Sequence, residues 1–548
     1  MGQKEPLGYI DYDSPSSHDW RICRLIVRKG KSGEVFRGRY ILIEDLKGKH
    51  KFLARVVSGP FYPPIDVPPS SAIRAELVRY NIPAEYYTAC DLEILGEIDE
   101  RKGIIESSFT RPKPYSPVYP LRGSDILWYL GLKTQGILLG HLIGYKKLKV
   151  SLNPWDPDLL PRNVGIFGTI GSGKTTTAQV LIEEASKAGW TVIVIDVEGE
   201  YLYMDHPNDD ARMIEILRNE YGLEPRGLSN FSVYTPACME PNRYDSQRFY
   251  IHFYELLSEP LVLLEILEAT EAQERYFEEV LERLGFQEAP SLPEFIALPE
   301  ESHSLMESLT LDYLIDHISR FAEDSHIPSF KRNSLAVLAS KLIRLRRMMI
   351  VDVSSPGVKP LEIRDLLKPG KVSVIDVSMV SRTVRNVIIA WVIASVFKWK
   401  LQTKRKYPAV MIVIEEAHSF VHREQAQYMK ATLEMLQRVS LRGRKRWISL
   451  VLISQMPSHI PTQIFELCNV RIIHTLRSED NIRILAHTTG GVTKQEWDLV
   501  PTLRTGEALI ATPKAPHPLI IKVRPALTKK CVLQEELPEG IRKEFLRK

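Results

Sequence analysis

The sequence predicts an α/β fold in which strands and helices alternate, with a β-rich domain before it and a helical insertion within it. Three observations favour this architecture. Residues 1–135 contain short runs rich in β-branched and aromatic residues, separated by turn signals. From residue 136, apolar runs of strand length alternate with segments of helix length, as is typical of α/β domains. Residues 205–365 break that alternation and carry apolar residues at helical spacing among many charges.

The composition is that of a globular protein with several domains. The 548 residues are 44% hydrophobic and 26% charged, and two to four domains are expected at this length. Five scattered cysteines without C-x-x-C spacing favour a reducing compartment and argue against a zinc site. The chain shows neither a signal peptide nor an apolar run of about 18 residues, so we expect a cytoplasmic protein without a membrane segment. A net charge of +4 is too small to indicate a partner.

The first domain, residues 1–135, is predicted to be a small β-barrel or sandwich. A helical segment is expected in it near residues 71–80. Its strands are expected at 21–27, 34–44, 51–57 and 92–98.

The α/β core is expected in two parts, 136–204 and 366–525. An α-helical insertion, 205–365, separates them, and a charged tail, 526–548, follows. Strands of the core are expected at 136–143, 148–152, 164–167, 191–196, 372–377, 409–415, 448–454, 470–475, 507–512 and 518–523, and its helices at 175–187, 382–400 and 423–438.

A phosphate-binding loop is predicted at residues 168–175, which match G-x-x-x-x-G-K-[ST] between an expected strand and helix. Glycines let backbone N–H groups turn inward around phosphate oxygens, and the helix N-terminus adds partial positive charge. Lys174 can reach the β- and γ-phosphates of ATP, and the Thr175 hydroxyl can bind Mg²⁺. The residues expected to contact the nucleotide are Gly168, Gly171, Ser172, Gly173, Lys174, Thr175 and Thr176.

A pair of carboxylates ends the apolar strand at 409–415. Glu415 occupies the position where P-loop enzymes hold Mg²⁺, and Glu416 would polarise the attacking water. The alternative is a strand followed by an acidic helix start, which is common because acids favour helix N-termini. With a phosphate loop upstream, the catalytic interpretation is preferred.

Two further strand ends carry polar candidates. Gln455 follows strand 448–454, where an amide would lie near the γ-phosphate and respond to hydrolysis, although a polar strand terminus explains it too. Glu200 follows strand 191–196 and would stabilise the water network or the metal, or cap the next helix.

A basic cluster precedes strand 448–454. A run of charge is usually a solvated face, but in a ring-forming ATPase an arginine here would reach the γ-phosphate of the neighbouring subunit. We expect this role of Arg444 first and of Arg442 second.

The ordered motifs GTIGSGKTTT, DVEGEY, VIEEAH, GRK, LISQ and LRTGEALI resemble the HerA branch of the HerA/FtsK superfamily. The N-terminal β-module, followed by Gly140–Gly144, also looks like the barrel (HAS-barrel) domain of that family. The resemblance implies a RecA-like P-loop NTPase core and a homohexameric ring that translocates duplex DNA, as a helicase, by ATP hydrolysis. Archaeal members typically act with a NurA-type nuclease in DNA end resection and recombinational repair.

The resemblance assigns Lys174 and Thr175 to phosphate and Mg²⁺, Glu416 to the catalytic acid, Gln455 to the sensor and Arg444 to the arginine of GRK. The chain departs from the family pattern at three places and would be a divergent paralogue. These are Glu415 in place of the commoner Asp, Leu441 and Arg442 in place of Arg and an acid, and Arg162 and Asn163 in place of Arg and His.

A DNA channel calls for basic side chains that meet phosphates. Arg382, Arg385, His422 and Arg423 follow sheet carboxyl ends and are candidates, although surface solvation explains them equally well. Two other functions stay open. One is a conjugative or secretion-type coupling ATPase, which commonly has a membrane anchor, and the other is a nucleotide-gated scaffold for a nuclease complex.

Overall fold

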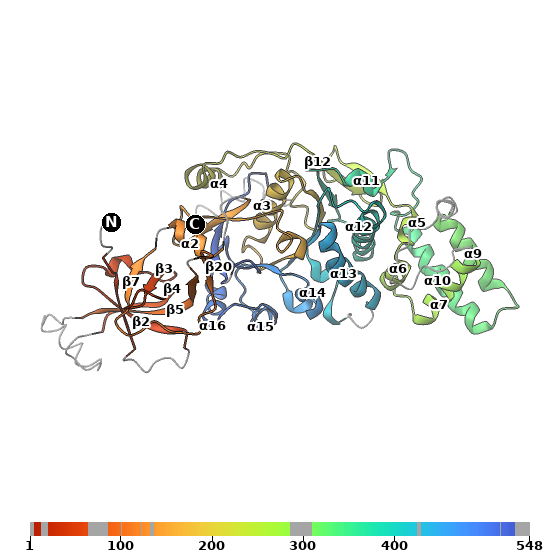
Figure 1. The fold of residues 1–548 in the computed structure, drawn as a ribbon. Coiled ribbons are helices and arrows are strands. Elements are labelled where there is room, and N and C mark those ends of the chain that lie inside the picture. The colour runs from red at the N-terminus through yellow and green to blue at the C-terminus, as the bar shows by residue number, and fades with distance from the viewer. Residues whose placement is uncertain are drawn as a thin grey trace, which may run out of the picture. The chain divides into compact units, whose positions relative to one another are not determined.

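The computed structural model of the chain describes residues 5–12, 20–63, 86–99, 101–121, 123–131, 136–284, 309–424, 429–515 and 517–531. The helix expected near 71–80, and the tail beyond 531, lie outside them. The chain forms two compact units (Figure 1). Unit 1 comprises residues up to 153 with 491–502 and 508–523, and unit 2 comprises the rest.

The N-terminal strands of unit 1 form a closed antiparallel barrel (Figure 1, red to orange). They pair in the order β2-β1-β7-β3-β4-β5, β2 pairs again with β5, and β6 extends from β5. Side chains of β2 are alternately buried and meet Ile41, Phe52 and Leu92 in one core. The predicted barrel is therefore confirmed. Its strands are β1 (Gly8–Asp11), β2 (Ile22–Val27), β3 (Tyr40–Glu44), β4 (Lys51–Phe61), β5 (Thr88–Asp99), β6 (Ile104–Glu106) and β7 (Pro117–Pro120).

One strand of the barrel is shorter than expected. The strand predicted at 34–44 begins only at Tyr40, because Ser32–Glu34 forms a 3₁₀ turn and Gly38 takes a positive φ of 89°. This conformation favours glycine and ends the extended run.

Unit 1 also includes segments that the sequence places in the α/β core, namely residues 136–153 and most of 491–523. A buried ion network helps to hold them there. The Arg55 guanidinium donates to Glu496 and to Glu93, both at 3.0 Å. β8 pairs antiparallel with β9 and with β20. The elements of this part are α2 (Gly123–Tyr129), β8 (Ile137–Leu142), β9 (Lys149–Leu152), α16 (Lys494–Trp497), β19 (Glu507–Ala511) and β20 (Leu519–Val523).

The sheet of unit 2 follows the order β14-β13-β12-β15-β11-β16-β17-β10-β18, and the recorded pairings between these strands are parallel. Its central strands are buried throughout, as expected of a parallel sheet covered on both faces. The strands are β10 (Val164–Phe167), β11 (Thr191–Asp196), β12 (Phe231–Pro236), β13 (Gln247–Tyr250), β14 (Lys359–Pro360), β15 (Val372–Asp376), β16 (Val410–Ile414), β17 (Ile448–Ser454) and β18 (Val470–Ile473).

Helices surround this sheet, and α12 and α13 pack against each other and against α6. α13 begins at Lys430 rather than at the expected residue 423. The helices of unit 2 are α3 (Lys174–Lys187), α4 (Ala211–Ile216), α5 (Phe253–Leu256), α6 (Pro260–Ile266), α7 (Glu271–Arg283), α9 (Leu311–Glu323), α10 (Ser329–Arg347), α11 (Ile363–Leu366), α12 (Arg382–Thr403), α13 (Lys430–Gly443), α14 (Thr462–Glu466) and α15 (Glu479–Thr488).

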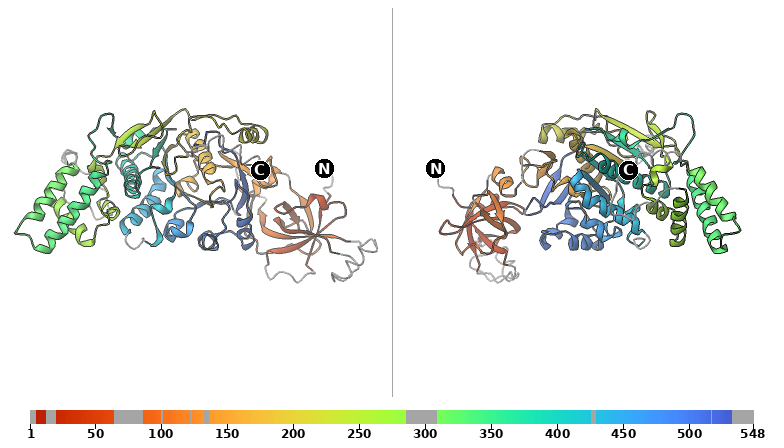
Figure 2. Two further views of the ribbon diagram at one scale, coloured as in Figure 1. Left: turned by 180° about the vertical axis from the view of Figure 1, so that it is seen from behind. Right: turned by 45° about the vertical axis from the view of Figure 1, so that its right-hand side comes forward.

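The insertion predicted at 205–365 is helical only in part. β12 and β13 extend the sheet beside β15, so the expectation of helix is wrong for residues 231–250. The helices α7, α9 and α10 do occur, and α9 and α10 lie side by side in both views of Figure 2 (green). A capping box of Thr270 and Gln273 begins α7.

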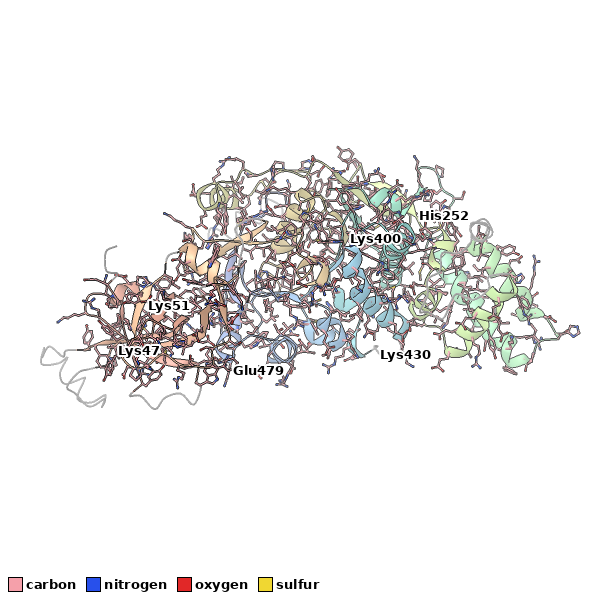
Figure 3. All side chains as sticks on the ribbon, viewed as in Figure 1. Lys47, Lys51, His252, Lys400, Lys430 and Glu479 are labelled. Carbon is pink, nitrogen blue, oxygen red and sulfur yellow. The ribbon has the colours of Figure 1, made fainter. Side chains whose placement is uncertain are left out.

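The long helix α12 carries a buried lysine, Lys400, in its last turn (Figure 3). Its ammonium donates to the carbonyl oxygens of Lys406, at 2.8 Å, and Pro408, and burial lowers its pKa to about 8. Within the described parts of the chain, no helix combines the length and apolarity needed to span a membrane.

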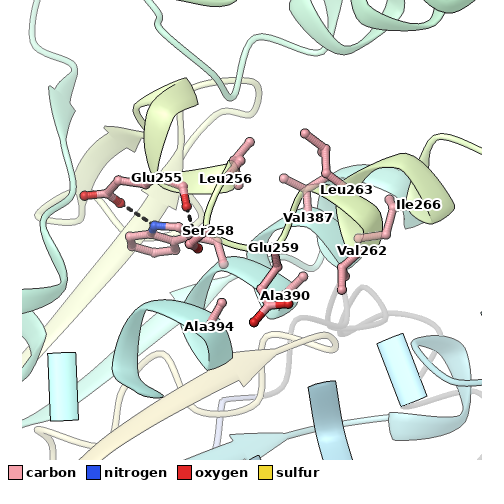
Figure 4. Close-up of a pocket in the computed structure, with 11 residues that line it drawn as sticks. Glu255, Leu256, Ser258, Glu259, Val262, Leu263, Ile266, Val387, Ala390 and Ala394 are labelled. Atoms are coloured by element: carbon pink, nitrogen blue, oxygen red, sulfur yellow. Dashed lines mark hydrogen bonds between the residues drawn. The ribbon is translucent and has the colours of Figure 1, made fainter. Parts of the chain in front are cut away.

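A small cavity lies where α5 and α6 meet α12 (Figure 4). Trp391 donates its indole N–H to Glu255 at one side of it, and Val262 and Val387 line the other. Its volume of about 10 Å³ has room for a single water molecule at most, so this cavity is no ligand site.

Candidate functional site

The phosphate loop connects β10 to α3 in the predicted place. Gly171 and Gly173 have φ angles of 72° and 112°, which the left-handed turn of the loop requires. Lys174 Nζ donates to the Thr169 carbonyl at 2.9 Å, inside the loop. Burial lowers the Lys174 pKa, while the charges of Glu416, Glu415 and Glu200 act to raise it. The ammonium is therefore at the loop and near the acids of the next strands.

Strand order brings the other candidates to the same edge. β17 lies between β10 and β16, with Phe167 opposite Ser454 and Ile414 opposite Leu452. Gly168 N donates to the Ser454 carbonyl at 3.3 Å. Because these strands are parallel, their carboxyl ends share one edge. The phosphate loop, Gln455 and Glu416 all follow directly from that edge.

Glu415 is buried and holds the loop after β11. Its Oε2 accepts the N–H groups of Val197 and Glu198 at 3.2 and 3.3 Å. Burial and the charges of Asp196 and Glu200 raise the pKa of Glu415 well above its ordinary value. The Glu415 side chain thus holds the loop that carries Glu200.

Asp196 is a second buried carboxylate at this edge. It accepts three backbone N–H bonds, from Gly199 at 2.8 Å, Glu200 at 3.2 Å and Tyr201 at 2.9 Å. Burial and the charge of Asp376 nevertheless raise its pKa to about 7. Asp196 shapes the loop, and in this structure it is a supporting residue.

Glu416 has a left-handed backbone, with φ and ψ both at 47°, which is uncommon for a residue with a side chain. Such conformations cluster at functional sites. His418 Nδ1 lies 3.0 Å from Glu416 Oε2 and 3.3 Å from Ser454 Oγ. His418 thus connects the end of the acidic strand with the residue preceding Gln455.

Arg444 and Arg442 lie away from the phosphate loop of their own chain. They precede β17, so they are at the amino edge of the sheet, opposite the loop. Arg444 donates to the Asp158 carboxylate and, at 3.2 Å, to the Pro157 carbonyl. Arg442 is exposed.

The four candidate DNA contacts are not equivalent. Arg382 and Arg423 are exposed, and Arg382 donates to the Ser419 carbonyl at 3.2 Å. Arg385 is half-buried near the acids: burial lowers its pKa, and the charges of Glu198, Glu415 and Glu416 act to raise it. His422 lies on the rim of a surface depression beside Arg423.

Sequence analysis missed three supporting residues. His474 is buried, with Nε2 2.9 Å from Thr177 Oγ1 and Nδ1 2.9 Å from the Glu507 carbonyl, so it braces α3. Lys530 lies 2.7 Å from Glu200 and near Lys174. His418 stands inside the quoted VIEEAH motif and could have been identified there, whereas nothing local marks His474 or Lys530.

The residues at the phosphate loop are chemically suited to bind a nucleotide together with Mg²⁺. Lys174, the N–H groups of the loop and the N-terminus of α3 form an anion site. Among the described residues, no group of three or more His, Cys, Asp or Glu side chains is arranged to hold a metal. Mg²⁺ needs no such group, because it binds through one or two protein oxygens, water and substrate phosphates. Thr175 and Glu415 are the side chains that the sequence predicts would hold it.

Comparison with known proteins agrees with the motifs. A family model for the central domain of helicase HerA matches residues 137–396. DNA double-strand break repair helicase HerA of Sulfolobus acidocaldarius is 23% identical over 428 residues, 76% of each chain. A probable helicase of that name from Methanocaldococcus jannaschii is 23% identical over 79% of this chain and 84% of its own. The solved structure of VirB4 of Thermoanaerobacter pseudethanolicus has a TM-score of 0.48 at 16% identity, over 75% of this chain and 99% of that one.

Proposed function

The chain belongs to the HerA family and is a P-loop ATPase, and from this premise we propose that it is a DNA translocase. In this proposal a homohexameric ring hydrolyses ATP to move along double-stranded DNA. It acts as a helicase with a NurA-type nuclease in DNA end resection and recombinational repair. The relatives that it resembles carry the name DNA double-strand break repair helicase, which supports DNA as the track.

One observation carries the ATPase part of the proposal. Lys174, Gln455 and Glu416 follow the carboxyl ends of β10, β17 and β16, three neighbouring parallel strands. A cation for phosphates, an amide and a carboxylate are thereby placed along one edge. This is the set of groups needed to bind a triphosphate and direct water at its terminal phosphorus.

Each side chain has a separate role in this proposal. Lys174 and the loop amides bind the β- and γ-phosphates, and Thr175 and Glu415 hold Mg²⁺, which supplies charge neutralisation at the phosphate oxygens. Glu416 orients the water and accepts its proton. Gln455 hydrogen-bonds near the γ-phosphate and senses its loss.

The position of Arg444 favours a ring. An arginine at the edge opposite the phosphate loop cannot serve the site of its own chain, but a head-to-tail neighbour would receive it. Arg442, exposed two residues earlier, is the second candidate for this contact.

The test is the rate of ATP hydrolysis by the full chain with and without linear duplex DNA. A translocase is expected to hydrolyse ATP several-fold faster with DNA, whereas a nucleotide-gated scaffold keeps one slow rate. Glu416→Gln should retain ATP and lose a factor of about 10² to 10⁴ in rate, and Lys174→Ala should lose nucleotide binding. Glu434→Gln, an exposed position on α13, is the control. A DNA-indifferent rate, or full turnover by Glu416→Gln, would contradict the proposal.

A further inference from the structure

A depression of about 800 Å³ opens at the carboxyl edge of the unit 2 sheet, lined by residues that follow β16, β17 and β18. Its lining residues come after three strands that follow one another in the sequence. His422 and Arg423 come after β16, His459 and Thr462 after β17, and α15 after β18. Figure 3 labels Glu479, the first residue of α15. The depression therefore shares the ends of β16 and β17 with the candidate ATPase site.

The lining is rich in donors for oxyanions. Arg423 is exposed, and Arg483 on α15 is 64% exposed and lies 3.6 Å from Asp480, a distance that leaves most of its guanidinium donors in solvent. His459 and Thr462 add an imidazole and a hydroxyl. Guanidinium, imidazole and hydroxyl groups are the side chains that contact nucleic-acid phosphates.

Carboxylates of Glu424 and Asp480 also line the depression and set a limit on its ligand. They argue against a highly charged free polyphosphate, since each would repel it. A phosphodiester carries one charge and reaches its site as part of a polymer. The open form of the depression suits a polymer that passes through, whereas a small ligand is usually enclosed over most of its surface.

Imidazoles connect the depression to the catalytic acid. His418 Nδ1 lies 3.0 Å from Glu416 Oε2, the His418 and His459 rings are 6.2 Å apart, and His459 and His422 are 5.1 Å apart. The N–H of Glu424 donates to His422 Nδ1 at 3.3 Å. Nδ1 is thus an acceptor, and the proton of the neutral ring is on Nε2, free to donate to an anion.

We propose that this depression binds backbone phosphates of DNA and that the row His422, His459, His418 couples its occupancy to Glu416. The inference rests on the proposed function, because it names where the DNA track meets the protein. It also provides a direct physical connection between the bound DNA and the site of ATP hydrolysis. A phosphate held by Arg423 and Arg483 contacts His422, whose ring packs on His459, which packs on the histidine beside Glu416.

The first experiment measures duplex DNA affinity of the full chain at several salt concentrations. Arg423→Gln and Arg483→Gln should each weaken binding about threefold to tenfold and reduce the slope of log affinity against log salt by about 1. Arg320→Gln is the matched control, because Arg320 is equally exposed and forms a similar short-range pair with Asp316 on α9. Inorganic pyrophosphate replaces DNA in a second arm.

The outcomes separate the two proposals. Absence of duplex binding by the wild-type chain would overturn the proposed function, and the depression with it. If the wild-type chain binds duplex DNA and the Arg423→Gln/Arg483→Gln variant binds it with the same affinity and salt slope, the proposal for the depression fails while the proposed function stands. If the variant binds pyrophosphate more weakly but binds duplex DNA as the wild type does, the depression is a site for free phosphates, and the proposal fails as well.

The second experiment tests the coupling with His459→Asn at saturating duplex DNA. The ratio of DNA-stimulated to DNA-free hydrolysis should fall towards 1 at duplex concentrations that saturate the variant, whose duplex affinity is measured separately because His459 also lines the depression. A ratio equal to that of the wild type would show that the imidazole row carries no signal.

Discussion

At the scale of single residues, the acidic edge of the sheet contains more buried negative charge than the folded chain alone favours. Asp196 and Glu415 are both buried, and burial raises the pKa of each. The charge of Asp376 adds to this effect at Asp196, and the charges of Asp196 and Glu200 add to it at Glu415. The backbone N–H groups that they accept offset this effect in part. The edge is therefore prepared for a cation, whether the Lys174 ammonium or a metal ion bound with nucleotide.

A prediction on pH follows from these two carboxyls. The folded pKa of Asp196, about 7, is above its ordinary value of 3.8, so the folded chain binds this proton more tightly than the unfolded chain. Its contribution to stability is present below about pH 4 and is lost as pH rises through 7. Glu415→Gln removes the second buried carboxyl at this edge of the sheet. The variant should gain stability relative to the wild type between pH 6 and 8.

Thermal unfolding of the nucleotide-free, metal-free protein across pH 5.5 to 8.5 measures this effect. Glu434→Gln provides the control, because that carboxyl is exposed and should leave the pH dependence unchanged. If the unfolding temperature of Glu415→Gln changes with pH in the same way as that of the wild type, ionisation of Glu415 does not lower the stability of the folded chain.

Sequence alone could propose candidate residues for the site but not the contacts by which they support one another. Lys174, Glu416 and Gln455 are each marked by a local motif at a strand end. His474 carries no such mark, because its contacts to Thr177 and Glu507 join segments far apart in the chain. The left-handed backbone of Glu416 is likewise a product of tertiary packing rather than of local propensity.

At the scale of elements, strands made of continuous apolar runs were predictable from the sequence, and strands interrupted by polar residues were not. β10, β11 and β17 have the bounds expected, because polar or glycine residues end each run. β12 and β13 were missed because polar residues interrupt their apolar pattern, and they form strands by pairing with β15 and with each other. The insertion of β17 between β10 and β16, on which the site depends, is set by pairing and cannot be deduced from the order of motifs.

The turn between α13 and β17 provides the prediction at this scale. Arg444→Ala should lower the rate of hydrolysis by about 10³ if the guanidinium acts on the γ-phosphate of a neighbour, with little change in ATP affinity. Mixing Arg444→Ala with Glu416→Gln protomers should restore activity. In equal mixture about a quarter of the interfaces combine an intact Glu416 with an intact Arg444 across the contact.

The alternative is that Arg444 only holds its own chain through Asp158. In that case the mixture would remain as inactive as its components. Arg442→Ala, tested in the same mixture, decides between the two arginines, because only the one that acts in trans should be complemented. ATP affinity, measured for each variant, separates a loss of chemistry from a loss of the site.

At the scale of the whole chain, the boundary of unit 1 depends on contacts between distant segments. Arg55 in β4 and Glu496 in α16 are 441 residues apart and share a buried hydrogen bond. Composition changes near residue 136, so a boundary was expected there. Nothing in the sequence of 491–523 indicates that it belongs with the N-terminal strands, since an ion pair of this separation leaves no local pattern.

The last prediction concerns this network. Burial opposes ionisation of Glu496, but the hydrogen bond and charge of His517 and the charge of Arg55 lower its pKa to about 2. Glu496→Gln leaves the Arg55 guanidinium buried with Glu93 as its remaining carboxylate partner in the network, and should destabilise unit 1 by about 3 to 5 kcal/mol. Glu106→Gln breaks an exposed pair with Lys102 in the same unit and should leave its stability almost unchanged.

Hydrogen exchange of the β4 and β5 amides is the suitable measurement, because a chain of two units need not unfold in one step. Exchange in β4 should accelerate in Glu496→Gln and stay unchanged in Glu106→Gln. The lowered pKa of Glu496 allows a second test at acidic pH. In the wild type the stabilisation is present above the ordinary pKa of 4.5 and is lost as pH falls towards 2, whereas Glu496→Gln has no such loss to show. Equal exchange in both variants would mean that apolar packing alone joins α16 to the barrel.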